Sequence, residues 1–294
     1  MWKRRTVEIL LLLAIGFVAI VLWLRWNEPR MLYYPIREME ATPATLGLKY
    51  EDLTLTASDG IRINAWFLPA APSPLTNLPP RTTVLFFHGN AGNIADRFEK
   101  LDVLHSLGAD VLIIDYRGYG RSEGKPNEAG TYHDAQAAYV YLTKTLNREP
   151  KTVVVYGESL GSAVAADLAS KVEVGGLVLE EAFTSIPDVG QKMFPFLPVR
   201  WLVRNKYDTL SKMPRIHAPV LILHSRDDEF FDIRHAQRLL AAANEPKLFW
   251  ELTASHNEPV ANRRHFIAGM EKFLDMVEAP PAQAAPLVKP AEGP

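Results

Sequence analysis

Five residues, Gly157-Glu158-Ser159-Leu160-Gly161, form the pattern in this chain that is most able to do chemistry. A β-branched run, Thr152 to Tyr156, precedes them, and a helix-like stretch, Ser162 to Lys171, follows. A turn this sharp between strand and helix brings the chain close to itself, so only glycine fits at 157 and 161. It would lift the Ser159 hydroxyl to a helix N-terminus, where backbone N–H groups can stabilise a developing oxyanion. The pattern therefore predicts a nucleophilic serine.

A serine hydroxyl needs a base within hydrogen-bond reach, and that base needs an acid that fixes its tautomer. In a strand–turn–helix arrangement of this kind, the chain order is serine, acid, histidine. Among the eight histidines, His256 directly follows the expected last strand, and it is the predicted base. His88 precedes Ser159 and is therefore out of order, and His265 falls in the expected final helix, where a surface or core role is expected.

Several carboxylates compete for the role of the acid. Those that follow the expected strand 220–223 are Asp227, Asp228, Glu229 and Asp232. Asp228 is the predicted acid, because a loop after that strand could turn it inward, and Asp227 is the next choice. Asp232 is typical of a helix N-cap. An alternative acid position lies one strand earlier, at Glu180 and Glu181.

The second oxyanion donor is expected from the loop His88-Gly89-Asn90-Ala91-Gly92-Asn93, which follows the expected strand Thr83–Phe87. There the N–H of Asn90 would pair with that of Leu160 to form an oxyanion hole. The loop lacks the G-x-G-x-x-G spacing and a Walker lysine, so nucleotide binding is not indicated. No H-E-x-x-H pattern supports a metal, and no cofactor is expected. The chain has no cysteine, which excludes disulfides and a thiolate nucleophile.

Short apolar runs alternate with helical patterns through most of the chain. This rhythm predicts an α/β domain over residues 46–277, with a mostly parallel sheet flanked by helices on both faces. An alternating pair of segments, Glu51 to Thr56 and Ile61 to Leu68, predicts an antiparallel hairpin. The other expected strands are Thr83–Phe87, Val111–Ile114, Thr152–Tyr156, Leu177–Leu179, Val220–Leu223 and Lys247–Leu252, and the helices are Ile94–Leu107, Gly130–Leu146, Ser162–Lys171, Ile233–Ala243 and Val260–Met276.

The segment 183–215 interrupts this alternation and is too long for a simple crossover. We expect it to form a small lid over the strand ends, where open α/β sheets bind ligands. Four of its apolar residues are predicted to form an acyl-binding wall: Phe194, Phe196, Leu197 and Trp201. An irregular helix pair packed on the core is the alternative.

The N-terminal segment 1–26 predicts a membrane-spanning anchor. Its apolar run, Ile9 to Leu24, follows Lys3-Arg4-Arg5 and lacks a small-residue cleavage site, which disfavours a cleaved signal peptide. The short basic flank favours a cytoplasmic N-terminus, with the main domain outside the cytoplasm. A connector is expected over 27–45 and a disordered Pro/Ala-rich tail over 278–294. The net charge of −2 argues against nucleic-acid binding.

The motifs together resemble the Bem46/ABHD13-type branch of the α/β-hydrolase superfamily. The resemblance rests on the loop 87–93, the run Asp115 to Gly124, the serine turn 157–161 and Ser255-His256-Asn257. It implies a serine hydrolase with a triad of Ser159, Asp228 and His256, often membrane-anchored by one N-terminal segment. The chain departs from the family pattern at Ser225 and Ser162, where glycine is usual.

The sequence thus predicts a membrane-anchored serine hydrolase that cleaves carboxylic esters or thioesters of a small or lipid-like acyl substrate through an acyl-enzyme. An amide-cleaving, aminopeptidase-like enzyme is an alternative, because the same three side chains serve both reactions. A second alternative is a catalytically silent protein of the same fold that acts as a binding protein.

Overall fold

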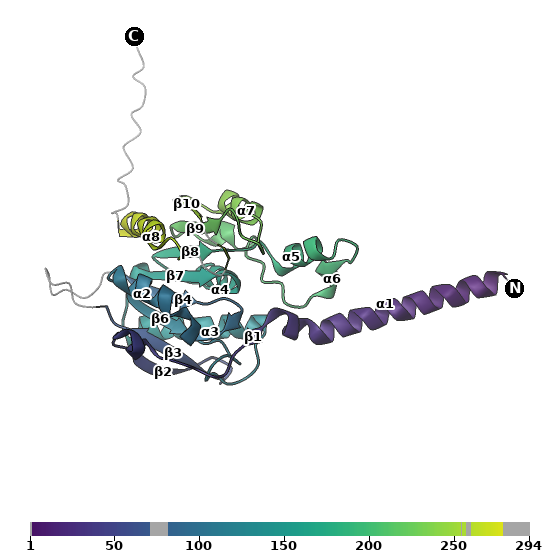
Figure 1. Ribbon diagram of the computed structural model, residues 1–294, viewed down its shortest axis with the longest axis horizontal. Coiled ribbons are helices and arrows are strands. Elements are labelled where there is room, and N and C mark those ends of the chain that lie inside the picture. The colour runs from purple at the N-terminus through teal and green to yellow at the C-terminus, as the bar shows by residue number, and fades with distance from the viewer. Residues whose placement is uncertain (1, 71–81, 254, 257–259, 279–294) are drawn as a thin grey trace, which may run out of the picture.

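The computed structural model describes residues 2–70, 82–253, 255–256 and 260–278. Its centre is an eight-stranded sheet of order β10-β9-β8-β7-β4-β6-β3-β2 (Figure 1). Strands β4, β6, β7, β8, β9 and β10 run parallel, and β3 pairs antiparallel with both β6 and β2, so the predicted hairpin is confirmed. The strands of this sheet are β2 (Glu51–Thr56), β3 (Arg62–Leu68), β4 (Thr83–Phe87), β6 (Asp110–Ile114), β7 (Val153–Glu158), β8 (Gly176–Glu180), β9 (Val220–Ser225) and β10 (Lys247–Leu252).

Helices cover both faces of this sheet, which is why the central strands are apolar on both sides. Along β4, Leu85 and Phe87 face one layer of core, whereas Val84 and Phe86 face the other. The first layer is closed by α3 (Glu128–Val140), α4 (Leu160–Ala169) and α7 (Arg234–Ala242), and the second by α2 (Phe98–Ser106) and α8 (Arg263–Glu278). The predicted α/β fold is confirmed.

Short elements connect these parts. Strands β1 (Tyr34–Pro35) and β5 (Ala91–Gly92) pair in parallel and join the N-terminal segment to the loop after β4. The single turns and short helices are η1 (Pro43–Leu46), η2 (Ile94–Arg97), the π-helical turn η3 (Tyr141–Thr145), η4 (Pro150–Thr152) and η5 (Met213–Arg215).

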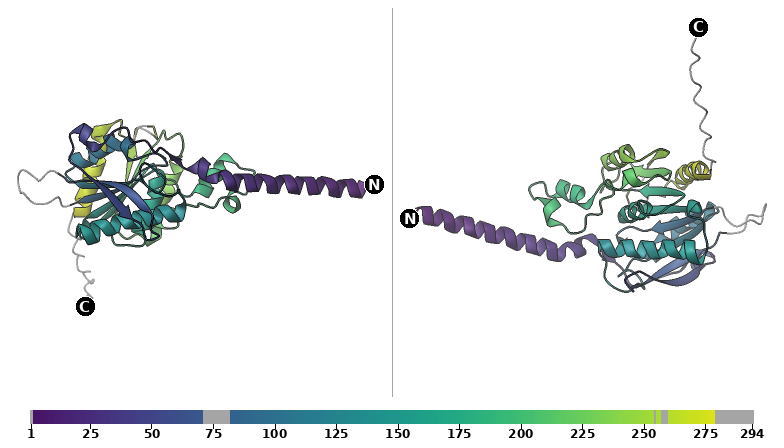
Figure 2. Two further views of the ribbon diagram at one scale, coloured as in Figure 1. Left: turned by 90° about the horizontal axis from the view of Figure 1, so that it is seen from below. Right: turned by 180° about the vertical axis from the view of Figure 1, so that it is seen from behind.

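The N-terminal helix α1 (Trp2–Leu32) projects away from the body (Figure 2). Over Arg4–Leu32 it is long and apolar enough to cross a membrane, and none of its apolar window is buried. The helix continues past the predicted anchor segment 1–26, through Pro29 to Leu32. The carbonyl of Pro29 still accepts the N–H of Tyr33 at 2.9 Å, and tertiary contacts hold the last turns in helical form.

The predicted lid segment leaves the sheet after β8 and carries α5 (Ile186–Met193) and α6 (Val199–Leu202). In Figure 1 these helices stand apart from the body, on the side from which α1 leaves. The predicted tail 278–294 lies outside the described residues, except for Glu278 at the end of α8.

Candidate active site

Ser159 occupies a strained turn between β7 and α4. Its backbone has φ 52° and ψ −116°, a left-handed conformation that is rare for a residue with a side chain. A Cβ at position 157 would stand 2.3 Å from the carbonyl oxygen of Gly161. A Cβ at position 161 would stand 2.0 Å from the carbonyl oxygen of Phe87. Both glycines are therefore required by the close approach of the backbone.

The structure brings Ser159, His256 and Asp228 together from three separate strand ends. The His256 Nε2 lies 3.1 Å from the Ser159 Oγ, and its Nδ1 lies 2.8 Å from Asp228 Oδ2. The second oxygen of Asp228 accepts the backbone N–H groups of Phe230 and Phe231 at 2.7 and 2.8 Å. The Asp228 carboxylate is thus held by three hydrogen-bond donors and faces the imidazole.

Two aromatic rings hold the imidazole in place. Phe230 and Phe231 present their rings at steep angles to the ring of His256, with centroids 5.1 and 5.0 Å away. Glu229 accepts the backbone N–H of His256 at 3.1 Å. The positioning residues 229–231 adjoin Asp228 in sequence, but nothing in their spacing identified their role.

A second buried carboxyl, Glu181, lies next to Asp228. Its Oε1 accepts the backbone N–H of Ser225 at 2.9 Å and also the Ser225 hydroxyl. Burial and the neighbouring Asp228 raise the pKa of Glu181 to about 9. Burial alone would raise the pKa of Asp228, but hydrogen bonds from His256 and Glu181 outweigh it and lower that pKa. The pair is therefore one protonated acid beside one carboxylate at neutral pH.

The surroundings of His224 fit a protonated Glu181. The Nε2–H of His224 donates to the carbonyl of Phe231 at 2.8 Å, and burial lowers the pKa of this histidine, so its ring is neutral. Its Nδ1 is then an acceptor, and it lies 3.2 Å from Glu181 Oε2 with no other partner. The ligand atoms of Glu181, His224 and Asp228 lie within 4.8 Å of one another.

The loop after β4 passes directly against the serine. A Cβ at position 89 would stand 3.5 Å from the Cβ of Ser159. The Asn90 carbonyl accepts the N–H of Tyr34 at 2.9 Å and the Tyr119 hydroxyl at 2.7 Å. The backbone N–H groups of Asn90 and Leu160, the predicted oxyanion donors, meet no acceptor among the residues that the structure describes.

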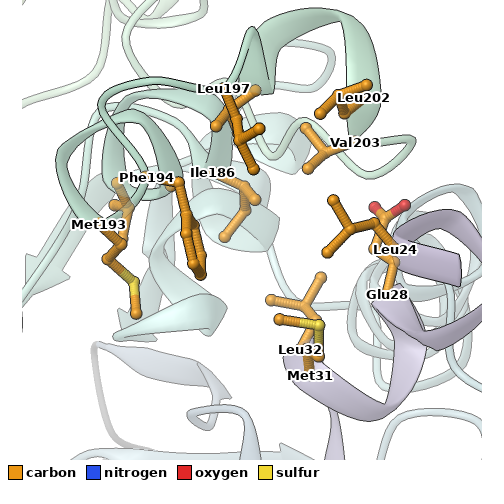
Figure 3. Close-up of a pocket in the computed structure, with 13 residues that line it drawn as sticks. Leu24, Glu28, Met31, Leu32, Ile186, Met193, Phe194, Leu197, Leu202 and Val203 are labelled. Carbon is orange, nitrogen blue, oxygen red and sulfur yellow. The ribbon is translucent and has the colours of Figure 1, made fainter. Parts of the chain in front are cut away.

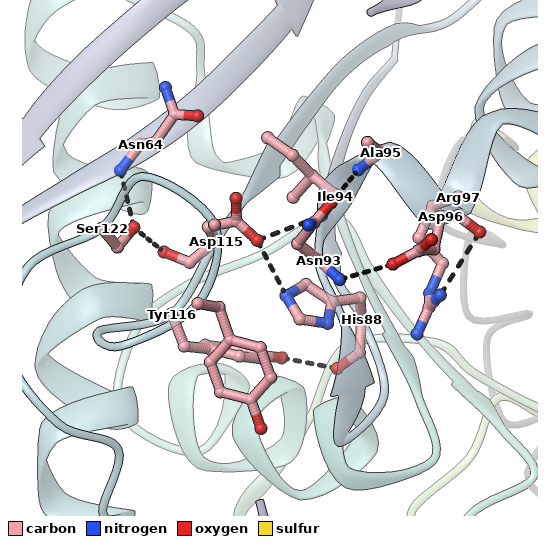
Figure 4. Close-up of polar contacts among 12 residues, drawn as sticks. Asn64, His88, Asn93, Ile94, Ala95, Asp96, Arg97, Asp115, Tyr116 and Ser122 are labelled. Atoms are coloured by element: carbon pink, nitrogen blue, oxygen red, sulfur yellow. Dashed lines mark hydrogen bonds and ion pairs between the residues drawn. The ribbon is translucent and has the colours of Figure 1, made fainter. Parts of the chain in front are cut away.

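A buried polar network fixes this loop (Figure 4). Asp115 accepts the N–H of Ile94 at 3.0 Å, and its carboxylate lies 3.6 Å from the ring of His88. The Tyr116 hydroxyl donates to the carbonyl of His88 at 2.9 Å. Asn93 and Asp96 complete a reciprocal cap on the next turn. The polar residues that follow β6 therefore orient the loop that carries Asn90.

Two of the four residues predicted to form an acyl-binding wall line a cavity, and two do not. A cavity of about 200 Å³ lies between the lid and the end of α1, and Phe194 and Leu197 line it (Figure 3). The prediction is wrong for Phe196 and Trp201, which are 97% and 81% exposed and do not line this cavity. The lid side is completed by Ile186, Val189, Gly190, Met193, Val199, Leu202 and Val203, and the α1 side by Leu24, Glu28, Met31 and Leu32.

The sequence that forms this site matches a known family. A family model of the "alpha/beta hydrolase fold" matches residues 82–201. The protein bem46 of Schizosaccharomyces pombe is 34% identical over 74% of this chain and 73% of its own length. The chain belongs to the α/β-hydrolase family.

Further relatives agree with this assignment. The α/β-hydrolase domain-containing protein WAV2 of Arabidopsis thaliana is 36% identical over 74% of this chain and 75% of its own length. Among solved structures, the esterase Pf2001 of Pyrococcus furiosus superposes with a TM-score of 0.68 at 22% identity, covering 83% of this chain and 98% of that one. At that identity, the structural likeness shows the fold alone. The family and the fold together support a hydrolase.

Proposed function

We propose that this α/β-hydrolase is a membrane-anchored serine hydrolase that cleaves carboxylic esters or thioesters through an acyl-enzyme. The observation that carries the proposal is the hydrogen-bonded chain from the Ser159 hydroxyl through His256 to Asp228. It starts at a serine held in a strained conformation at the N-terminus of α4.

In the acylation step, His256 takes the hydroxyl proton of Ser159 as the oxygen attacks the acyl carbon. Asp228 stays ionised, because its pKa is lowered, and it stabilises the imidazolium that forms. The N–H groups of Asn90 and Leu160 are the donors for the oxyanion. His256 then protonates the leaving alcohol or thiol, and a water molecule repeats the cycle on the acyl-enzyme.

The acyl chain would occupy the cavity between the lid and α1. Its walls are almost entirely apolar, and the carbonyl of Leu32, one of the lining residues, accepts a hydrogen bond from the Asn90 side chain at 2.9 Å. One lining residue of the cavity is therefore in contact with the loop that carries the oxyanion donor. An apolar wall of this kind favours a medium or long acyl chain over acetate.

The anchor would be α1, which has the length and composition of a membrane span. The basic residues before it favour a cytoplasmic N-terminus and a catalytic domain on the other side of the membrane.

The test is a substrate panel with the full chain in detergent micelles. We expect hydrolysis of p-nitrophenyl esters and acyl thioesters, with rates that rise with chain length from acetyl to medium chains. Anilides of the same acyl groups report amide cleavage. Ester hydrolysis that persists undiminished in Ser159→Ala would refute the mechanism, and turnover of the anilides alone would replace it with an amidase.

A further inference from the structure

Large apolar side chains are exposed at the tip of the lid, which we define as residues 193–201. Phe196 is 97% exposed, Trp201 is 81% exposed and Met193 is 68% exposed. Exposed aromatic side chains gathered on one protruding segment mark an interaction surface. Since Phe196 and Trp201 do not line the cavity, the acyl site does not account for them.

The lid is fastened to α1 at a defined position along that helix. The Arg25 guanidinium donates to the carbonyls of Trp201 and Leu202, each at 3.2 Å. The buried carboxylate of Glu28 accepts the backbone N–H groups of Arg204 and Asn205 at 2.9 and 2.7 Å. These hydrogen bonds therefore hold the lid against the last turns of α1, and Figure 3 shows side chains of both segments facing the cavity between them.

That position corresponds to a membrane surface. The apolar run of α1 ends at Leu24, and Arg25 is the first charged residue after it. The run spans roughly 24 Å at about 1.5 Å per residue, which nearly fills a hydrocarbon core of about 30 Å, so Arg25 lies at the level of the lipid headgroups. Trp201, bonded through its carbonyl to Arg25, lies at the same level, where tryptophan is enriched in membrane proteins.

The charge of the lid fits the same environment. Between Val189 and Tyr207 the chain carries four basic residues and no acidic one: Lys192, Arg200, Arg204 and Lys206. Arg200 also pairs with Asp188, at 2.9 Å, just before this stretch. Basic side chains beside exposed aromatic ones are typical of segments that lie in a bilayer interface with anionic lipids.

We propose that the tip of the lid is a membrane-docking surface that seats Phe196 and Trp201 in the interface of the bilayer crossed by α1. The proposal rests on α1 being a membrane anchor, as proposed above. Leu24, the last residue of the apolar run, lines the cavity, so the cavity lies at the depth where lipid acyl chains begin. The substrate class that fits this arrangement is a bilayer-resident acyl lipid rather than a water-soluble ester.

The absence of cysteine allows a site-specific test with the full chain. Single cysteines replace Phe196 at the lid tip, Val18 in the middle of α1 and Lys151 at the opposite end of the sheet. Each side chain is exposed, by 97%, 53% and 80%, so the folded structure tolerates an attached fluorophore. The labelled proteins are reconstituted into phosphatidylcholine–phosphatidylglycerol vesicles. Lipids that carry a spin label near the headgroup or deep in the acyl chain serve as quenchers.

We expect the label at 196 to lose about half or more of its emission to the shallow quencher. The label at 18 should respond to the deep quencher, and the label at 151 to neither. Quenching at 18 without quenching at 196 would overturn the docking surface and leave the anchor intact. Absence of quenching at 18 would refute the anchor and the docking surface together, whereas the proposed chemistry at Ser159 is tested separately by the substrate panel.

Discussion

Glu181 should be a protonated acid at neutral pH, and Glu181→Gln tests this directly. A glutamine keeps the size of the side chain, and its amide can still donate a hydrogen bond to Asp228 or to the unprotonated Nδ1 of His224. Its oxygen can still accept from Ser225. The variant therefore preserves the geometry around Asp228 while removing one titratable group. We expect it to retain most of the esterase rate at pH 7.

The magnitude follows from the pKa of Glu181, which is raised from 4.5 to about 9. Between those values the folded protein holds a proton that the unfolded chain has released. A carboxyl group with a raised pKa contributes stability that is complete below the unfolded pKa and is lost as the pH rises. The contribution of Glu181 to the free energy of unfolding should thus fall by about 1.4 kcal/mol per pH unit across this window. Asp228 does not contribute to the pH dependence of the unfolding free energy near neutral pH. Its pKa is lowered in the folded protein, so it is ionised in both the folded and the unfolded chain.

The assay is equilibrium urea unfolding of the full chain in detergent micelles at pH 6, 7 and 8. Over this range the stability of Glu181→Gln relative to wild type should rise by up to about 3 kcal/mol. Glu245→Gln makes the same change at a side chain that is 76% exposed, and it should keep the wild-type slope. Parallel pH dependences for wild type and Glu181→Gln would mean that Glu181 is ionised when folded, and would refute the reasoning on the acid pair.

Three further predictions concern the turn, the acid and the lid. Asp228→Asn should lower kcat by at least about tenfold more than Asp227→Asn, as measured with a p-nitrophenyl ester. Equal losses of kcat in the two variants would contradict the assignment of Asp228 as the acid that orients His256. Gly161→Ala should destabilise the protein by several kcal/mol, about 3 or more, in urea unfolding, because its Cβ would stand 2.0 Å from a carbonyl oxygen of β4. Leu197→Ala should lower kcat/KM for medium-chain esters by roughly tenfold, about 1–2 kcal/mol, and spare acetyl esters. Phe196→Ala is its matched control, and a chain-length profile altered as strongly there would argue against the cavity as the acyl site.

Much of the fold could be predicted, because its signals are local. The strands β2, β4 and β10 begin and end at the predicted residues, since each is a short apolar or alternating run. The predicted serine turn depends on backbone crowding at positions 157 and 161, which the two glycines reveal directly. The geometry that joins Ser159, Asp228 and His256 follows the chain order expected for this arrangement of strands.

The remainder depended on tertiary contacts that leave no local signal. The helix α1 passes Pro29 because Glu28 and Leu32 pack against the lid, a contact between segments more than 150 residues apart. The aromatic residues of the lid could be counted in the sequence, but only its packing on α1 decides that Leu197 faces the cavity and Phe196 faces away. Glu181 appeared in the sequence as an alternative acid, and its role beside Asp228 became visible only with both carboxyls in place.

The most direct test of the central claim is the site and rate of covalent labelling by a fluorophosphonate, followed by intact-protein and peptide mass spectrometry. Our account predicts one adduct per chain, on the peptide that contains Ser159, and none in Ser159→Ala. Labelling of His256→Ala should be slower by at least about a thousandfold, because the hydroxyl loses its base. An adduct on another residue, or labelling of His256→Ala at the wild-type rate, would contradict the claim that His256 activates Ser159 as the nucleophile.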